Sequence, residues 1–226
     1  MAVDHQEESH IVDQYQNWSQ FTKKNLTKPH RSILGNHDIE QWDDHDFSPA
    51  SGKKRAIELY GMKNRYWEEK IGGWRIIGLD TVHRREDAFM GFIDAEQLDW
   101  LKGVFLDTKT PTLVCGHMPL LSVTALADSN LKATDTLLPI STASEVSNAR
   151  EAVNLFRSAG NVKLCLSGHT HMIDRCDYGG TAYICAGAVC GNWWNGTHQG
   201  FAPSYTQIDL NTDGSFETKT IFWENP

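Results

Sequence analysis

Apolar residues recur every three or four positions in several stretches of the chain, which is the spacing of one face of a helix. The clearest such stretches are residues 11–24, 52–61, 94–106 and 145–159. Asp94 begins the third stretch and is a typical N-cap, because its side chain can accept a hydrogen bond from a backbone amide of the first turn. These four stretches are therefore predicted to be helices.

Short apolar runs that end in glycine predict strands between these helices. Such runs occupy residues 30–36, 111–117 and 162–168, and a Gly-Gly pair joins two more runs into a predicted hairpin over 64–80. Residues 121–143 lack periodicity and are predicted to form a long loop of the kind that often covers a functional site.

Strands that alternate with helices indicate a single α/β domain over residues 1–226. Beyond Asp174 the chain reads as short strands joined by glycine-containing turns, so residues 187–226 are expected to be a β-rich C-terminal part.

Three predicted strands end in glycine followed by polar residues, in the segments "LGNHD", "CGHMP" and "SGHTH". In open α/β sheets the ligand site lies outside the carboxyl ends of the strands. The segments would therefore bring one set of side chains to a common rim: Asn36, His37, Asp38, His117, His169 and His171. Neutral imidazole is a common ligand of transition metals, and residues i and i+2 of an extended segment project to the same side. The pattern thus predicts a metal site.

The charge balance restricts the possible partners. The chain has 21 Lys and Arg against 29 Asp and Glu, for a net charge of −8, and it offers no basic stripe. Nucleic acid is therefore not an expected partner. A small phosphorylated substrate remains compatible with the acidic composition, because bound metal ions can supply positive charge.

Membrane insertion and secretion receive no support from the sequence as given. No apolar stretch approaches the roughly 20 residues of a membrane span, and the polar N-terminus resembles neither a signal nor a transit peptide. The five cysteines form no C-x-x-C pair, although a Cys176–Cys185 or Cys185–Cys190 disulfide is compatible with the sequence. Nothing specifies an oligomeric state.

The order G-N-H-D, G-H and G-H-x-H resembles the calcineurin-like metallophosphoesterases. The resemblance extends over nearly the whole chain and includes "GLDT", "GFIDAEQLDWL" and "GAVCGNWWNG". It implies a four-layer α/β/β/α sandwich and an enzyme that hydrolyses phosphomonoesters or phosphodiesters at two divalent ions, Mn, Fe or Zn.

The resemblance also implies a role for each matching residue. Asn36, His117 and His169 would bind one metal ion, and His171 would bind the other. His37 would protonate the leaving oxygen or stabilise phosphoryl charge. Asp38 would accept a hydrogen bond from His37, which orients the ring and raises its pKa.

The chain departs from the family at its N-terminus, where an earlier D-x-H and G-D motif are expected and neither precedes Gly35. We therefore expect an N-terminally truncated fold with little activity, which upstream strands would restore. Asp4-His5 and "DDHD" at 43–46 are the local substitutes for the missing ligands.

Weaker candidates and alternatives remain. Asp80 is expected to be structural, with a substrate contact as the alternative, and His83 is expected to be a loop residue, with reach to the substrate as the alternative. Trp193 and Trp194 either wall the pocket or are ordinary aromatics, and His198 has no assigned role. The alternative function is a catalytically silent relic of the family that acts as a binding protein. A structural zinc protein fits poorly, because its closed tetrahedral site would use Cys and His and not an Asn ligand.

Overall fold

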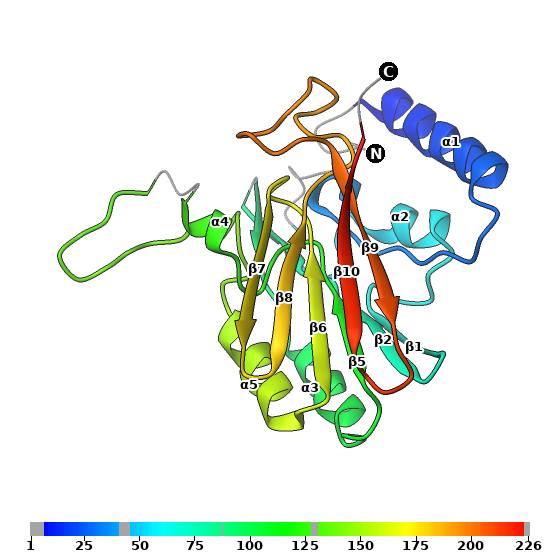
Figure 1. Cartoon of the computed structure of the whole chain (residues 1–226). Coiled ribbons are helices and arrows are strands. Elements are labelled where there is room, and N and C mark those ends of the chain that lie inside the picture. Colours follow the sequence, from blue (N-terminus) through cyan, green and yellow to red (C-terminus); the bar gives the residue numbers. More distant parts are fainter. Residues whose placement is uncertain (1–6, 41–45, 87, 128–130, 224–226) are drawn as a thin grey trace.

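The computed structural model (Figure 1) describes residues 7–40, 46–86, 88–127 and 131–223. The helices are α1 (Glu8–Asn25), the 3-10 turn η1 (Asn36–Asp38), α2 (Lys54–Leu59), α3 (Ala95–Val104), α4 (Val123–Ala127) and α5 (Ala149–Ala159). The strands are β1 (Trp67–Ile71), β2 (Trp74–Gly78), β3 (Val82–Arg85), β4 (Ala88–Gly91), β5 (Thr112–Cys115), β6 (Val162–Ser167), β7 (Ile173–Tyr178), β8 (Thr181–Ala186), β9 (Ser204–Leu210) and β10 (Phe216–Phe222).

The main sheet has the strand order β1-β2-β5-β6-β8-β7. Its four inner strands are parallel, and the outer strands β1 and β7 run antiparallel to their neighbours. The carboxyl ends of β2, β5 and β6 therefore lie at one edge of the sheet, with Asp80, His117 and His169 following them in the chain. This parallel arrangement brings distant segments of the sequence to one place.

Each face of the main sheet is packed by a different layer (Figure 1). On one face α3 and α5 contribute Leu101, Phe105 and Phe156 to the largest apolar core. On the other face Ile208 and Leu210 of the β9–β10 hairpin pack against a second core that includes Trp74, Leu113 and Leu164 of the main sheet. Helices α1 and α2 form a smaller core of their own, centred on Leu34. The predicted α/β fold class is confirmed, with a central sheet of parallel and antiparallel strands.

Most predicted elements form where expected. The four helices are confirmed to within a few residues, and Gly72 and Gly73, with φ of 59° and 85°, make the tight turn between β1 and β2. Both turn positions need positive φ, which glycine adopts without steric cost.

Two local predictions are wrong. Residues 30–35 do not form a strand, because no strand in the described part of the chain pairs with them; the Trp67 indole donates to the Ser32 carbonyl instead, at 2.9 Å. The loop at 121–143 contains the short helix α4.

All five cysteines are free thiols, so neither disulfide considered above forms. Within the described ranges no helix is both long and apolar enough to cross a membrane.

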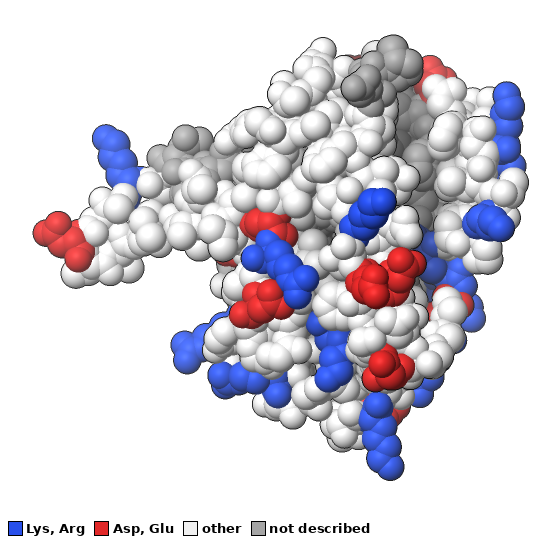
Figure 2. All heavy atoms as spheres, in the orientation of Figure 1, with Lys and Arg blue, Asp and Glu red and all other residues white. Residues whose placement is uncertain are grey.

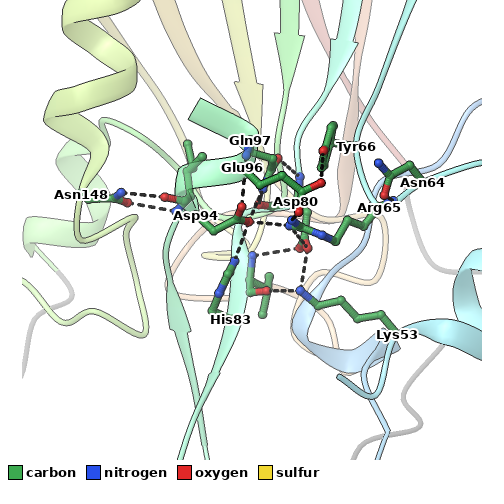
Figure 3. Close-up of polar contacts among 12 residues, drawn as sticks. Lys53, Asn64, Arg65, Tyr66, Asp80, His83, Asp94, Glu96, Gln97 and Asn148 are labelled. Carbon is green, nitrogen blue, oxygen red and sulfur yellow. Dashed lines mark hydrogen bonds and ion pairs between the residues drawn. The ribbon is translucent and has the colours of Figure 1, made fainter. Parts of the chain in front are cut away.

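A buried network of charges fixes the segment after β2 (Figure 3). The Lys53 ammonium donates to the Asp80 carboxylate at 2.6 Å and to the Val82 carbonyl at 2.5 Å. Arg65 lies 3.2 Å from Asp80 and 2.6 Å from Asp94, the N-cap of α3. Asp80 is fully buried, which agrees with the structural role expected for it. The network ties α2, β2 and α3 together beside the edge where the strands end.

We expect Lys53→Met to lower the free energy of unfolding by about 3–5 kcal/mol, because removing one partner leaves the buried Asp80 charge only partly compensated. The matched control is Lys70→Met, whose exposed pair with Asp107 at 3.4 Å should contribute about 0–1 kcal/mol. Urea denaturation of both variants measures the difference. Equal losses of unfolding free energy in the two variants would mean that the buried ion pair stabilises the fold no more than the exposed one does.

Candidate metal centre

The 3-10 turn η1 carries Asn36 and His37 and is braced by Asp38. One Asp38 oxygen accepts a hydrogen bond from the Gly35 amide at 2.8 Å, and the other accepts from the Tyr60 hydroxyl at 2.7 Å. Burial raises the pKa of Asp38 above its ordinary value, and these two hydrogen bonds oppose that rise. Asp38 thus holds the turn, while its expected role toward His37 stays a prediction.

Three side-chain atoms from distant segments converge next to this turn. Nε2 of His117 lies 2.8 Å from Oδ1 of Asn36 and 3.1 Å from Nδ1 of His169. Two ligands bonded to one metal ion at about 2.0–2.1 Å are themselves about 3 Å apart. The two distances from His117 Nε2 are therefore those of neighbouring ligand atoms on one metal ion.

Hydrogen bonding supports the same interpretation. The other ring nitrogen of His169, Nε2, lies 2.6 Å from the Ala143 carbonyl, so it carries the proton and leaves a lone pair on Nδ1. Asn36 Oδ1 is also an acceptor. The His117 Nε2 atom can share at most one proton with these two acceptors, whereas a cation would satisfy all three atoms. The residues present thus fit a divalent metal ion.

The imidazoles are held in their neutral, metal-binding form. Burial lowers the pKa of His117 well below its ordinary value, and the nearby His169, His37 and His171 lower it further. Burial is also the main cause of the lowered pKa of His169 and of His171. Because a metal ligand must be unprotonated, this environment favours coordination.

His171 occupies the adjacent position, and its orientation is also set by the backbone. Its Nδ1 atom lies 2.6 Å from the Gly191 carbonyl, so Nδ1 donates and the lone pair remains on Nε2. The expectation of an extended His-x-His segment is wrong: His169 and His171 have φ of 69° and 60°, in the left-handed region. These conformations are rare for residues other than glycine and are typical of functional sites.

The four predicted ligands and His37 line one pocket of about 200 Å³. Its lining is Asn36, His37, His117, Ser144, His169, Thr170, His171, Trp193 and His198. The sequence assigns no role to His198, whose ring lies 5.5 Å from that of His171. The Ala143 and Gly191 carbonyls could not be predicted either, because no sequence motif identifies a backbone acceptor. The expectation that His83 is a loop residue is wrong: it lies in β3, buried 3.4 Å from Asp94, and it does not line this pocket.

His117 also borders a larger groove of about 860 Å³. Its lining is mostly apolar and includes Ile33, Ile76, Cys115 and Leu166. The convergent ligand atoms belong to the smaller pocket, so the chemistry is assigned there.

The ligand set is asymmetric between the two metal positions. Among the described residues no group of three or more His, Cys, Asp or Glu is arranged to hold a metal ion, because the third convergent ligand is the Asn36 amide. The second position has His171 as its predicted ligand. Asp4, His5 and residues 43–45 lie outside the described residues, and Asp46 hydrogen-bonds to Ser48.

Comparison with known proteins gives the class of this site. The sequence model of the calcineurin-like phosphoesterase family matches residues 3–172. The chain belongs to the calcineurin-like phosphoesterase family, as its G-N-H-D, G-H and G-H-x-H motifs predicted.

Individual relatives agree with this assignment. An Arabidopsis thaliana protein named manganese-dependent ADP-ribose/CDP-alcohol diphosphatase is 32% identical over 97 residues, which are 42% of this chain and 26% of that protein. A Synechococcus sp. protein named probable cyclic nucleotide phosphodiesterase is 26% identical over 200 residues, or 86% of this chain and 65% of that protein. The chain thus spans less than two thirds of the length of either relative.

A solved structure shares the fold. A dimetal phosphatase from Danio rerio superposes with a TM-score of 0.56 over 96% of this chain and 79% of that one, at 16% sequence identity. At this identity the likeness shows the fold alone.

We expect Gly35→Ala to weaken retention of divalent metal about tenfold while the protein stays folded. A Cβ atom at this position would lie 3.0 Å from Cε1 and Nδ1 of His117, which forces the ring away from its partners. Gly168→Ala is the matched control, because a Cβ atom there meets nothing within 4 Å. Metal content after dialysis against graded chelator measures the effect, and equal retention by both variants would contradict it.

Proposed function

We propose that this protein hydrolyses phosphate esters, either monoesters or diesters, at a centre of two divalent metal ions. The observation that carries the proposal is that Asn36 Oδ1 and His169 Nδ1 lie 2.8 and 3.1 Å from His117 Nε2, beside His171 in one pocket. Asn36, His117 and His169 would hold one ion, and His171 would contribute to the other. When bound, such ions activate water and stabilise the charge of the transferring phosphoryl group.

The protein's own groups prepare this chemistry. The Ala143 and Gly191 carbonyls hold His169 and His171 in the tautomers that direct a lone pair toward the pocket. Among the described residues the lining includes no Asp or Glu, so in a chain of net charge −8 this part of the pocket presents no carboxylate to repel a phosphate. A phosphate ester is therefore a suitable ligand once metal is present.

His37 is proposed as the proton donor to the leaving oxygen. It lines the pocket on the turn that also carries Asn36, which places an acid next to the proposed metal position. Asp38 braces the turn from below through Gly35 and Tyr60. The ring would thus be held in place while it gives up a proton, a contribution of about 100-fold or more to rate.

The names of the relatives support diesters and related linkages among the substrates. One relative is named for ADP-ribose and CDP-alcohols, and the other is named for cyclic nucleotides. The metal in the first name, manganese, is one of the three expected here. A binding protein without hydrolysis is the second candidate, and it is favoured by the single predicted ligand, His171, at the second metal position.

The test uses the natural gene product that contains these residues, loaded with manganese or zinc and assayed with p-nitrophenyl phosphate and its bis-ester. We expect His37→Ala to keep its metal but to lose about 100-fold or more in turnover, because only a proton donor is removed. His117→Ala should lose both metal and activity, because it removes the proposed ligand atom that lies close to both Asn36 and His169. His10→Ala, an exposed histidine on α1, is the control.

Turnover of the His37→Ala protein within threefold of the parent would contradict the catalytic role proposed for His37. Metal retention without hydrolysis of either ester by the parent would favour the binding protein. Full metal content in His117→Ala would contradict the ligand assignment.

A further inference from the structure

The segment 187–203 forms one wall of the pocket and has an unusual composition. It contains no Asp, Glu, Lys or Arg, and it carries two adjacent tryptophans, Trp193 and Trp194. In Figure 2 the upper part of the visible face, where Figure 1 places this segment, is mostly uncharged, whereas charges of both signs gather below it. A group that approaches the pocket along this wall thus meets aromatic and neutral surface.

The backbone of the segment is held in a strained turn. The Asn192 amide donates to the Gly196 carbonyl at 2.9 Å, and the Trp194 amide donates to the Cys190 carbonyl at 2.7 Å. Trp193 and Trp194 both have positive φ, 51° and 67°, which is unfavourable for bulky side chains. Strain of this kind persists where the surrounding structure imposes it, and it is concentrated at ligand sites.

The turn couples Trp193 to the metal centre. The Gly191 carbonyl that orients His171 belongs to the same turn. The Trp193 ring lies 4.8 Å from that of His37, nearly perpendicular at 85°, and 5.5 Å from that of His171. Trp193 is nevertheless 48% exposed, so much of the indole is open to whatever enters the pocket.

We propose that Trp193 determines substrate specificity by stacking on a planar aromatic ring carried by the leaving alcohol of the ester. The inference rests on the proposed function, in which His37 protonates the leaving oxygen. Because Trp193 contacts His37, the group attached to that oxygen lies against the indole. An exposed tryptophan on a neutral wall favours a flat, uncharged ring over a charged or branched group.

Two sources of such a ring share this chemistry. One is an aryl or arylmethyl ester, with the ring close to the leaving oxygen, and the other is a nucleoside, with the ring one sugar away. Removing an aromatic side chain that stacks on a nucleobase weakens binding by about tenfold, whichever nucleobase is bound.

The test measures binding by calorimetry to the metal-loaded natural gene product, with benzylphosphonate and cyclohexylmethylphosphonate as probes. Neither probe is hydrolysed, and the two differ mainly in whether the ring is flat. We expect the parent to bind benzylphosphonate about threefold to tenfold more tightly. Trp193→Ala should remove this preference, and Trp193→Phe should keep it. Trp194→Ala is the matched control, because Trp194 packs near Trp223 and does not line the pocket.

Equal affinity of the parent for the two probes, or a preference that survives in Trp193→Ala, would overturn the proposal, and so would the absence of binding by both. A comparison of the affinities for adenosine 5′-monophosphate and ribose 5-phosphate, measured on the same metal-loaded protein, distinguishes the nucleoside from the aryl source. Hydrolysis of benzyl phosphate is scored separately. A Trp193-dependent preference without hydrolysis would count against the proposed function and not against this inference.

Discussion

Three potential ligand atoms lie close together at the carboxyl edge of the sheet, and the rest of the structure holds them there. Asn36 Oδ1, His117 Nε2 and His169 Nδ1 lie 2.8 and 3.1 Å apart in succession, and at most one shared proton is available to them. Acceptors do not stay this close in a buried site unless a proton or a cation lies between them. A divalent ion satisfies all three, so the geometry itself indicates metal binding.

The fold provides that geometry by simple means. Parallel strands β5 and β6 end side by side, which brings His117 and His169 together although 52 positions separate them in the chain. The absence of a Cβ atom at Gly35 lets the His117 ring pack against η1. Backbone carbonyls of two separate loops fix the tautomers of His169 and His171. Each of these contacts forms between neighbouring loops, and the sheet places those loops next to one another.

The sequence predicted that the candidate ligands share one place in the fold, but it did not predict their conformations. The candidate ligands follow apolar segments that end in glycine, and this pattern can be read directly from the sequence: Asn36, His117, His169 and His171. The left-handed backbone of His169 and His171 could not be read, because it is imposed by contacts with Ala143 and Gly191 on other segments. Residues 30–35 have the composition of a strand, yet a strand exists only with a partner to share its hydrogen bonds. His198 escaped for the same reason: its place beside His171 arises from tertiary folding.

The most direct test of this account is a crystal of the natural gene product soaked with manganese or zinc and measured at the absorption edge of the metal. We expect an anomalous difference peak within bonding distance of Asn36 Oδ1, His117 Nε2 and His169 Nδ1, at about 2.0–2.2 Å from each. A fully loaded crystal with no peak between these three atoms, or with its peaks elsewhere, would contradict the central claim that they form a metal centre.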